Sequence, residues 1–333
     1  MAKATAKATR AALGETLNEL IDEGQQIVAL DADLAGSTTT GKVGEAHPER
    51  FFNAGIAEAN MIGAAAGLAL AGQTAFTGTF AAFGTGRVYD QIRNTVAYNN
   101  LNVKIAPTHS GVTVGPDGGS HQMLEDIALM RVLPNMRVLV PADYTAAKAA
   151  VRYAATTPGP FYIRLGRAAT PDIYSPEGLA PANGAQKDGG ETLDVTKIQT
   201  VRKGSDLTIA ACGIEVAQAL EAAELLAAEG ISAEVLDIMC VKPLDVDTLL
   251  ASVKKTGKLV TAEEHNVYGG MGSAISEVLS EVHPVPTRRI GVPDTFGTSG
   301  EPSELIKHFN LDAPSIAAAA KELCQYRAKM SIH

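Results

Sequence analysis

The sequence of 333 residues contains no tryptophan, and aromatic residues make up only 5% of it. Its three cysteines, Cys212, Cys240 and Cys324, lie far apart, and none forms a CxxC pair. Such spacing argues against a disulfide framework or a cysteine zinc site, and it favours a reducing cytosol. The N-terminal stretch MAKATAKATRAALGETL also lacks the apolar core of a signal peptide. We therefore expect a cytoplasmic protein.

Basic residues are in deficit: 28 Lys and Arg stand against 37 Asp and Glu, which gives a net charge of −9. This balance argues against general affinity for nucleic acid or an anionic membrane, but a local basic site for a small phosphorylated substrate stays open. Long apolar runs are also missing. Gly72, Gln73 and Thr74 interrupt the most apolar stretch well short of the ~20 residues that a membrane span needs.

Apolar strand-like segments alternate with helical segments along most of the chain, which predicts βαβ units around parallel sheets. In the first block we expect strands at Ile27–Asp33, Thr74–Thr79, Val103–Thr108, Arg137–Val140 and Phe161–Leu165. In the second block we expect them at Leu207–Cys212, Ala233–Ile238, Lys258–Thr261 and Arg289–Val292. The sequence therefore predicts two consecutive α/β domains with mainly parallel sheets, at residues 1–170 and 205–333, joined by a linker of residues 171–204.

The stretch Phe51–Phe83 carries one carboxylate, Glu58, and no charged residue follows it until Arg87. Apolar or small residues lie around every face of the helix that begins there, so we expect this helix to be buried. A carboxylate at its first turn should be desolvated unless a specific group hydrogen-bonds to it. The alternative is an ordinary first-turn glutamate that the helix dipole stabilises.

The loop His109–His121 follows a predicted strand and carries two histidines and Asp117 on a glycine-rich backbone. Glycine allows positive φ angles and close approach to a ligand, and histidine suits proton transfer near neutral pH. Ligands of parallel α/β sheets bind beyond the carboxyl ends of the strands. The loop is therefore a candidate ligand site, and a structural turn is the alternative. Its spacing matches no metal-ligand pattern, so we expect no metal site in this chain.

Two further groups of residues lie near predicted strand ends. Arg164 and Arg167 could grip a phosphate or sulfonate, or they could form an edge ion pair. Phe80 and Phe83 could be core residues, or they could stack on a flat heteroaromatic ring whose nitrogen is hydrogen-bonded to Glu58. No serine or cysteine stands in a nucleophile elbow, and no phosphate-binding P-loop is present.

Together these segments resemble the C-terminal half of transketolases. In the first domain the resemblance is carried by FNAGIAEAN, GTFAAF, THSGVTVGPDGGSHQ, LPNMRVLVPAD and YIRLGR. In the second domain it is carried by DIMCVKPLD, EEHNVYGGMGSAISE and VPDTFGTSGEPSEL. The resemblance covers essentially the whole chain. It implies a pyrimidine-binding thiamine domain followed by a transketolase C-terminal domain.

The resemblance implies a thiamine diphosphate site with a catalytic carboxylate. Glu58 would bind N1′ of the aminopyrimidine and, by favouring the imino form of the ring, help to deprotonate the thiazolium carbon. Phe80 and Phe83 would line the pocket of the ring. A third aromatic residue of the classical enzymes corresponds here to Gly86, which leaves the stacking arrangement open.

The resemblance also implies substrate contacts. His109 would be catalytic and would lie near the hydroxyl and carbonyl oxygens of the donor sugar, and Asp117 would read a sugar hydroxyl. His121 and Arg167 would hold the substrate phosphate, with Arg164 as a further contact. Gly14 stands where the classical phosphate site has a serine, so the anionic end of the substrate stays open.

Transketolases hold the diphosphate and Mg²⁺ through a separate N-terminal domain with a Gly-Asp-Gly…Asn motif. This sequence contains no Gly-Asp-Gly. We therefore expect one subunit of a split transketolase that is inactive alone, with metal and diphosphate held by a partner chain. We also expect an α2β2 assembly in which this chain self-associates. The complex would transfer a two-carbon ketol unit from a ketose phosphate to an aldose.

Other interpretations remain open. The β subunit of a 2-oxo-acid dehydrogenase has this length and also needs a partner, and a deoxyxylulose-phosphate synthase shares the architecture but is normally a longer chain. The motif His109–His121 is closer to that of transketolases. A scaffold subunit without catalytic activity is a further alternative. It would have no need to keep the following set together: Glu58, His109, Asp117 and His121.

Overall fold

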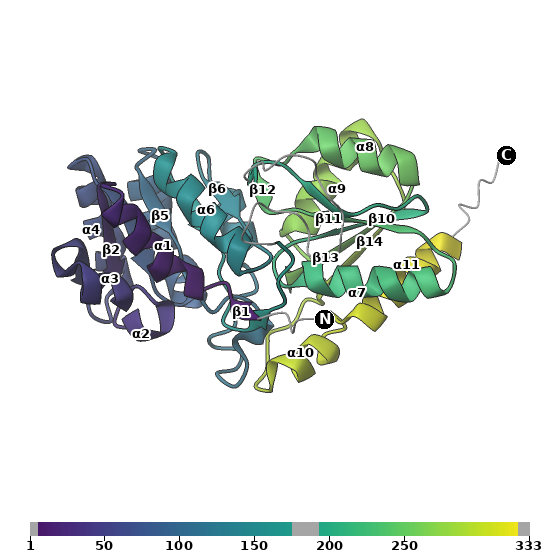
Figure 1. Ribbon diagram of the computed structural model, residues 1–333, viewed down its shortest axis with the longest axis horizontal. Coiled ribbons are helices and arrows are strands. Elements are labelled where there is room, and N and C mark those ends of the chain that lie inside the picture. The colour runs from purple at the N-terminus through teal and green to yellow at the C-terminus, as the bar shows by residue number, and fades with distance from the viewer. Residues whose placement is uncertain (1–5, 175–192, 326–333) are drawn as a thin grey trace.

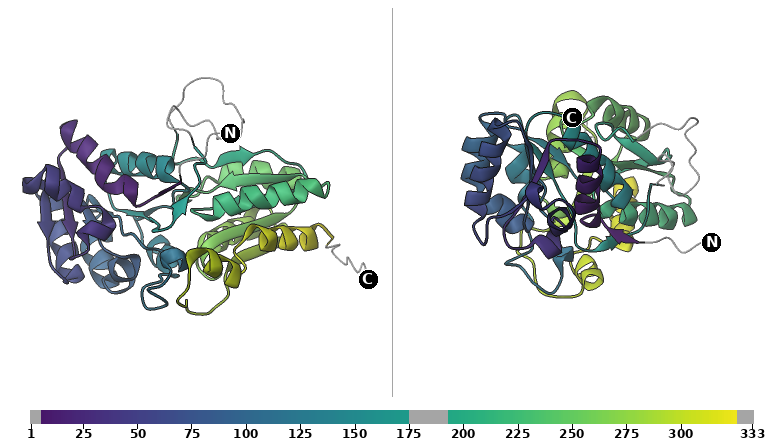
Figure 2. Two further views of the ribbon diagram at one scale, coloured as in Figure 1. Left: turned by 60° about the horizontal axis from the view of Figure 1, so that its bottom comes forward. Right: turned by 60° about the vertical axis from the view of Figure 1, so that its left-hand side comes forward.

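The computed structural model describes residues 6–174 and 193–325. Two α/β domains lie end to end, the first coloured purple to teal and the second green to yellow (Figure 1; Figure 2, left). Each domain is built around one mainly parallel sheet with helices on both faces. The fold class predicted from the sequence is therefore confirmed.

Seven strands form the sheet of the first domain. Their order is β12-β6-β7-β5-β4-β2-β3, and every pairing is parallel except that of β12 with β6. The strands are β2 (Ile27–Asp31), β3 (Phe51–Asn53), β4 (Thr74–Gly78), β5 (Val103–Ile105), β6 (Arg137–Leu139), β7 (Phe161–Ile163) and β12 (Cys240–Lys242). Because helices cover both faces, the central strands are buried on both sides, which explains their nearly continuous apolar sequences.

Helices α1 and α6 pack together on one face of this sheet, and α4 and the π-helical segment η3 pack on the other. The helices are α1 (Ala11–Asp22), α2 (Ala35–Thr38), α3 (Gly41–Ala46), α4 (Glu58–Leu70), α5 (Asp126–Arg131) and α6 (Tyr144–Thr156). The segments η2 (Ala82–Gly86) and η3 (Gln91–Ala97) are π-helical, and η1 (Pro48–Arg50) and η4 (Val112–Val114) are 3₁₀ turns. Single π-helical turns frequently occur at functional sites.

Helix α4 departs from the prediction that it is buried on all sides. The sheet covers only one of its faces, which carries Glu58 and the apolar residues Met61, Ile62, Ala65 and Ala66. The opposite face is exposed in the single chain and consists of Ala59, Asn60, Gly63, Ala64, Gly67 and Leu70. Leu70 is 76% exposed, and Ile56 in the preceding loop is 79% exposed. An apolar composition shows that a surface avoids water, but it does not show which partner covers that surface.

The second domain has a five-stranded sheet in the order β14-β13-β10-β11-β9, in which only β9 is antiparallel to its neighbour. Helices α8 and α9 cover one face and α7 and α11 the other (Figure 1). The strands are β9 (Gln199–Arg202), β10 (Leu207–Ala211), β11 (Ala233–Asp237), β13 (Leu259–Asn266) and β14 (Thr287–Val292). The helices are α7 (Glu215–Ala228), α8 (Val246–Thr256), α9 (Met271–Val282), α10 (Pro302–His308) and α11 (Ala313–Gln325).

The two domains are interlocked. Strand β12 comes from the second half of the chain but extends the first sheet, and β1 (Lys7–Ala8) pairs with β8 (Ala169–Thr170). Two apolar clusters, one on each side of the sheets, run through both domains. Strand β9 arises from the predicted linker of residues 171–204, so the second domain begins before residue 205. Residues 175–192 of that linker lie outside the described residues.

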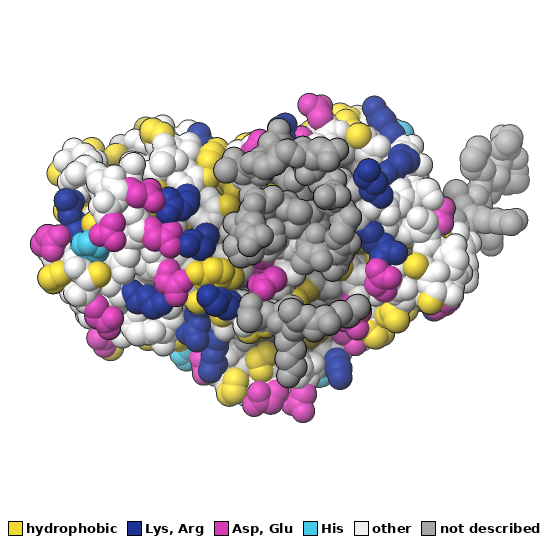
Figure 3. Space-filling model, viewed as in Figure 1, with side chains coloured by type: hydrophobic (Ala, Val, Ile, Leu, Met, Phe, Trp, Pro, Cys, Tyr) yellow, Lys and Arg dark blue, Asp and Glu magenta, His cyan; other side chains and the backbone are white. Residues whose placement is uncertain are grey.

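Charges of both signs are mixed on the face shown in Figure 3. Between α1 and α6, for example, Lys148 pairs with Glu19 at 2.6 Å and Arg152 with Glu23 at 2.9 Å. Exposed pairs of this kind contribute little stability individually. Among the described helices, none is long and apolar enough to cross a membrane.

Candidate active site

The candidate site is built where strands β4 and β5 end. Phe80 follows β4, His109 follows β5, and a backbone bridge between Phe80 and Thr108 holds the two ends side by side. The rings of Phe80 and His109 stack with centroids 3.8 Å apart and an angle of 23° between their planes. Since parallel strands end at the same edge of the sheet, two residues from separate sequence motifs meet here.

His109 is buried and has a left-handed backbone conformation with a φ of 61°, which is uncommon for a residue with a side chain. Its Nδ1 lies 2.7 Å from Thr108 Oγ1, and its Nε2 lies 3.5 Å from Nη1 of Arg10. A guanidinium can only donate, so Nε2 faces it with its lone pair and Nδ1–H donates to Thr108. Burial, followed by the charges of Arg10, Arg167 and His121, lowers the pKa of His109 to about 3. The imidazole is therefore neutral at physiological pH.

Glu58 is the first residue of α4, and only 4% of it is exposed. Its carboxylate accepts a hydrogen bond from Nη1 of Arg87 at 2.7 Å. The Arg87 guanidinium also lies over the ring of Phe83, with its central carbon 4.1 Å from the ring centroid. This arginine is the specific partner that a desolvated carboxylate requires. The sequence analysis did not single out Arg87.

The aromatic residues connect the two ends of the site. Phe80 and Phe83 have centroids 6.2 Å apart and nearly parallel rings, and the ring of His121 stands edge-on to both, at 6.3 and 5.3 Å. A continuous run of contacts thus leads from the Glu58 carboxylate through these rings to His109. The structure brings together five residues that the sequence analysis proposed from three separate motifs.

The second domain fixes the loop that carries the two histidines. Gln122 Nε2 donates to the carbonyl of Thr298 at 2.8 Å, and the Glu264 carboxylate accepts from the backbone N–H of Thr113 at 2.5 Å. Gly111 has a φ of 78°, and a Cβ at this position would lie 2.2 Å from Glu264. The close approach of the two domains therefore requires glycine at this point in the loop.

Cationic side chains collect beside His109. Arg167 lies 3.8 Å from Asp117, and both side chains are more than one third exposed. Arg10, which directly precedes α1, donates to the carbonyl of Ser37 at 2.8 Å. Burial, and then the proximity of Arg167, lowers the pKa of Arg10. The sequence analysis also did not single out Arg10, because the pairing of β1 with β8, distant in the sequence, brings it here.

Arg164 lies at the domain junction, and the structure does not support its predicted contact with a phosphate. Its side chain is only 6% exposed. It pairs with Asp126 through Nε at 2.7 Å and Nη2 at 3.3 Å, and Nη2 also donates to the carbonyl of Glu264 at 2.8 Å. Burial alone would lower the pKa of Arg164, but the carboxylates of Asp126 and Glu264 raise it. The guanidinium is thus occupied by protein groups.

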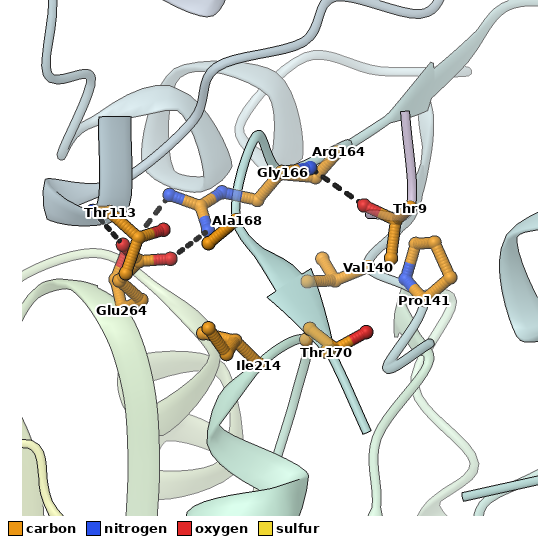
Figure 4. A pocket seen from close by; sticks show the side chains of 11 residues that line it. Thr9, Thr113, Val140, Pro141, Arg164, Gly166, Ala168, Thr170, Ile214 and Glu264 are labelled. Carbon is orange, nitrogen blue, oxygen red and sulfur yellow. Dashed lines mark hydrogen bonds and ion pairs between the residues drawn. The ribbon is translucent and has the colours of Figure 1, made fainter. Parts of the chain in front are cut away.

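A small cavity of about 20 Å³ lies beside Arg164 and Glu264 (Figure 4). In Figure 4 Arg164 and Glu264 point toward one another, and the hydroxyl of Thr9 accepts from the backbone N–H of Gly166. A volume of this size holds about one water molecule. The cavity therefore belongs to the domain junction and is too small for a substrate.

The two glycines noted in the sequence have different surroundings. A Cβ on Gly14 would lie 2.1 Å from the carbonyl oxygen of Thr39, so α1 packs directly on the chain after α2 and a serine does not fit. A Cβ on Gly86 would meet only the methyl group of Met123, at 3.7 Å. Arg87, and not a third aromatic residue, covers Phe83.

The possible metal ligands among the described residues do not form a cluster. Within residues 6–174 and 193–325, no group of three or more His, Cys, Asp and Glu side chains is arranged to hold a metal ion. The polar groups of the candidate site are instead a single buried carboxylate, two histidines and a set of arginines.

The sequence matches two family profiles in succession. Residues 5–172 match the transketolase pyrimidine-binding domain, and residues 196–316 match the transketolase C-terminal domain. Together these matches cover most of the chain. The chain therefore belongs to the transketolase family, and the resemblance seen in its motifs is confirmed.

Two relatives and one solved structure match almost the whole length of the chain. A putative transketolase C-terminal section of Methanocaldococcus jannaschii is 46% identical over 317 residues, which are 95% of this chain and 96% of the relative. A 6-deoxy-6-sulfo-D-fructose transketolase subunit of Clostridium sp. is 43% identical, over 93% of this chain and 92% of its own length. A solved structure described as a split gene transketolase, inactive β4 tetramer, is 46% identical and superposes with a TM-score of 0.85. The match covers 96% of this chain and 99% of the chain in that structure.

Proposed function

We propose that this chain is the subunit of a two-chain transketolase that carries the pyrimidine-binding and C-terminal domains. With its partner it transfers a two-carbon ketol unit from a ketose phosphate to an aldose. The observation that carries this proposal is a run of contacts between the buried Glu58 carboxylate and the neutral His109. It passes through Arg87 and then through the Phe83 and Phe80 rings. A scaffold has no use for such an arrangement.

The residues present fit the ring half of thiamine diphosphate. Glu58 offers a buried carboxylate at the start of a helix, and Phe80 and Phe83 offer flat apolar surfaces that Arg87 links to it. When bound, the cofactor supplies a nucleophilic carbon and an electron sink for the transferred ketol unit. Glu58 would hold and exchange a proton at a ring nitrogen. The low exposure of Glu58 keeps water from competing for that proton.

His109 is suited to handle a sugar hydroxyl proton. Its Nδ1–H is committed to Thr108, so the lone pair of Nε2 faces the arginine-lined side of the site. With a pKa of about 3 the ring stays neutral, and Nε2 can accept a hydrogen bond from a hydroxyl group throughout the physiological pH range. The stack on Phe80 fixes the orientation of the imidazole.

Arg10 and Arg167, with His121 nearby, would bind the anionic end of the substrate. Two guanidinium groups close enough to lower the pKa of one of them form a site that favours a tetrahedral oxyanion. Asp117, which pairs with Arg167 at 3.8 Å, would exchange that contact for a sugar hydroxyl. Because the relative from Clostridium acts on a sulfonated sugar, a sulfonate is the alternative to a phosphate at this position.

A partner chain would supply the groups that hold the diphosphate and Mg²⁺. Two similarities support this part of the proposal: the matched relative is a C-terminal section, and the matched structure is described as a split gene transketolase in an inactive β4 form. The exposed small and apolar face of α4, which begins at Glu58, is suited to close packing in an assembly. An α2β2 complex in the cytoplasm is the arrangement that we propose.

Calorimetry tests the proposal. Thiamine diphosphate with Mg²⁺ is titrated into this chain alone, and then into this chain mixed with a chain that carries the diphosphate-binding domain. We expect tight binding only in the mixture, followed by turnover of ketose phosphates and not of 2-oxo acids. Tight Mg²⁺-dependent binding to this chain alone would contradict the divided site, and 2-oxo-acid turnover would favour the dehydrogenase-type alternative.

A substitution separates catalysis from scaffolding. In the assembled complex Glu58→Ala should abolish ketol transfer, while Glu45→Ala, at an exposed position of α3, should leave it unchanged. Full activity of the Glu58 variant would show that the chain acts only as a scaffold.

A further inference from the structure

Arg87, which directly follows the π-helical segment η2, makes two contacts that are unusual for a half-exposed arginine. Its guanidinium donates to Oε1 of the buried Glu58 at 2.7 Å and lies 4.1 Å from the centroid of Phe83. Among the described residues its side chain has no other hydrogen-bond partner, and 49% of it is exposed. The Arg87 side chain thus contacts Glu58 and Phe83 and can move away from them into the solvent.

A π-helical turn sets this position. The backbone N–H of Arg87 bonds to the carbonyl of Ala82, five residues earlier, at 3.4 Å. The widened turn contains Gly86, where a side chain would meet only the methyl group of Met123. Position 86 therefore has room for a side chain that glycine does not supply, and Arg87 is the residue that covers the Phe83 ring.

The aminopyrimidine of thiamine diphosphate would need the same two contacts. It must share a proton with the Glu58 carboxylate, and it must lie flat against the phenylalanine rings. A guanidinium is also flat, also carries N–H groups, and is already bound to that carboxylate and that ring. Two planar groups cannot occupy one ring face and one hydrogen-bonding position together.

We propose that Arg87 is a place-holder for the aminopyrimidine: it occupies Glu58 and Phe83 while the site is empty, and the cofactor displaces it. This role rests on the proposed function. In the empty site the arginine neutralises a buried carboxylate that would otherwise be unpaired. On cofactor binding its half-exposed side chain turns into the solvent, and Glu58 becomes free to exchange a proton with the ring.

The variant Arg87→Met tests the proposal, because methionine keeps the length of the side chain and loses the charge and the N–H donors. At a half-exposed site, an ion pair and a cation–π contact each favour the bound over the displaced Arg87 side chain by up to roughly fivefold. Their removal should therefore tighten cofactor binding about tenfold. Arg93→Met is the matched control, since within residues 6–174 and 193–325 the Arg93 guanidinium donates only to the side chain of the adjacent Asn94.

Association and dissociation of thiamine diphosphate are measured by surface plasmon resonance on the reconstituted complex with saturating Mg²⁺. We expect Arg87→Met to raise the association rate about tenfold with an unchanged dissociation rate, because only the fraction of open sites changes. Weaker binding or faster dissociation would show that Arg87 holds the bound cofactor, and unchanged rates would show that its contacts have no effect. Either result overturns the proposal.

A second measurement does not depend on a variant. Crystal structures of the wild-type complex with and without thiamine diphosphate should show the Arg87–Glu58 hydrogen bond only without it. The same hydrogen bond in both structures would refute displacement. If the wild-type complex binds no thiamine diphosphate at all, the proposed function itself fails, which is a different result from either of these.

Discussion

Asp237 ends strand β11 in the interior of the protein and provides a quantitative test of the domain junction. Its Oδ2 accepts a hydrogen bond from the hydroxyl of Tyr174 at 2.6 Å, while its Oδ1 is buried without a partner among the described residues. Tyr174 and Ile173 donate their backbone N–H groups to Asp143 of the first domain. The tyrosine thus links carboxyl groups of both domains.

Burial raises the pKa of Asp237 to about 7. The hydrogen bond from Tyr174 acts in the opposite direction, and the charge of Asp143 adds a smaller increase. The folded chain therefore binds this proton more tightly than the unfolded chain does. The stabilisation is complete below about pH 4 and is lost as the pH rises to about 7. Each pH unit between the two pKa values corresponds to about 1.4 kcal/mol, so the ionised carboxylate costs up to about 4 kcal/mol above pH 7.

Asp237→Asn replaces the carboxyl group with a neutral group that can still accept from Tyr174. We expect this variant to be more stable than the wild type by up to about 4 kcal/mol at pH 8 and to differ little from it at pH 4. Urea denaturation followed by circular dichroism measures the difference, since the chain has no tryptophan. Asp247→Asn, at an exposed position of α8, is the control. Equal effects of Asp237→Asn at the two pH values would refute the reasoning.

Three further predictions concern the arginines and His109. Arg167→Ala should raise KM about 10- to 100-fold for phosphorylated sugars and much less for unphosphorylated ones, because the variant loses charge-assisted hydrogen bonds to the phosphate. A steady-state assay measures both values, and equal increases would argue against an anion site. Arg164→Met should cost about 3–5 kcal/mol of unfolding free energy, because it leaves the buried carboxylate of Asp126 without its ion-pair partner. A stable variant with a raised KM would contradict the assignment of Arg164 to the junction. The imidazole of His109, with its pKa of about 3, should give NMR shifts that stay constant between pH 5 and 8, and a titration midpoint in that range would refute its neutrality.

The fold and the centre of the site could be predicted because the relevant signals are local. Buried parallel strands produce apolar segments at regular intervals, and polar residues at their carboxyl ends are candidates for a site. Phe80 and His109 each follow such a strand, and the structure stacks their rings. The motifs that carry the family resemblance include both residues.

Arg10 and Arg87 could not be predicted because their positions depend on contacts that no local pattern records. Arg10 lies beside His109 because β1, near the start of the first domain's sequence, pairs with β8, near its end. Arg87 reaches Glu58 because a π-helical turn shifts it by one residue relative to an ordinary helix. The exposed face of α4 was missed for a related reason: its apolar residues are equally compatible with a core and with an interface.

Arg164 and Arg167 show most clearly where sequence reasoning ends. Both follow strand β7 in the segment YIRLGR, and both are suited to binding a phosphate. Strand β7 ends at Ile163, so the alternation of side chains along a strand does not extend to these two arginines. The sequence does not show which of them faces inward. The structure decides this: Asp126 at the start of α5 and Glu264 of the second domain enclose Arg164 and leave Arg167 beside His109. In this site, the choice between a structural and a ligand-binding arginine is thus made by the packing of one domain on the other.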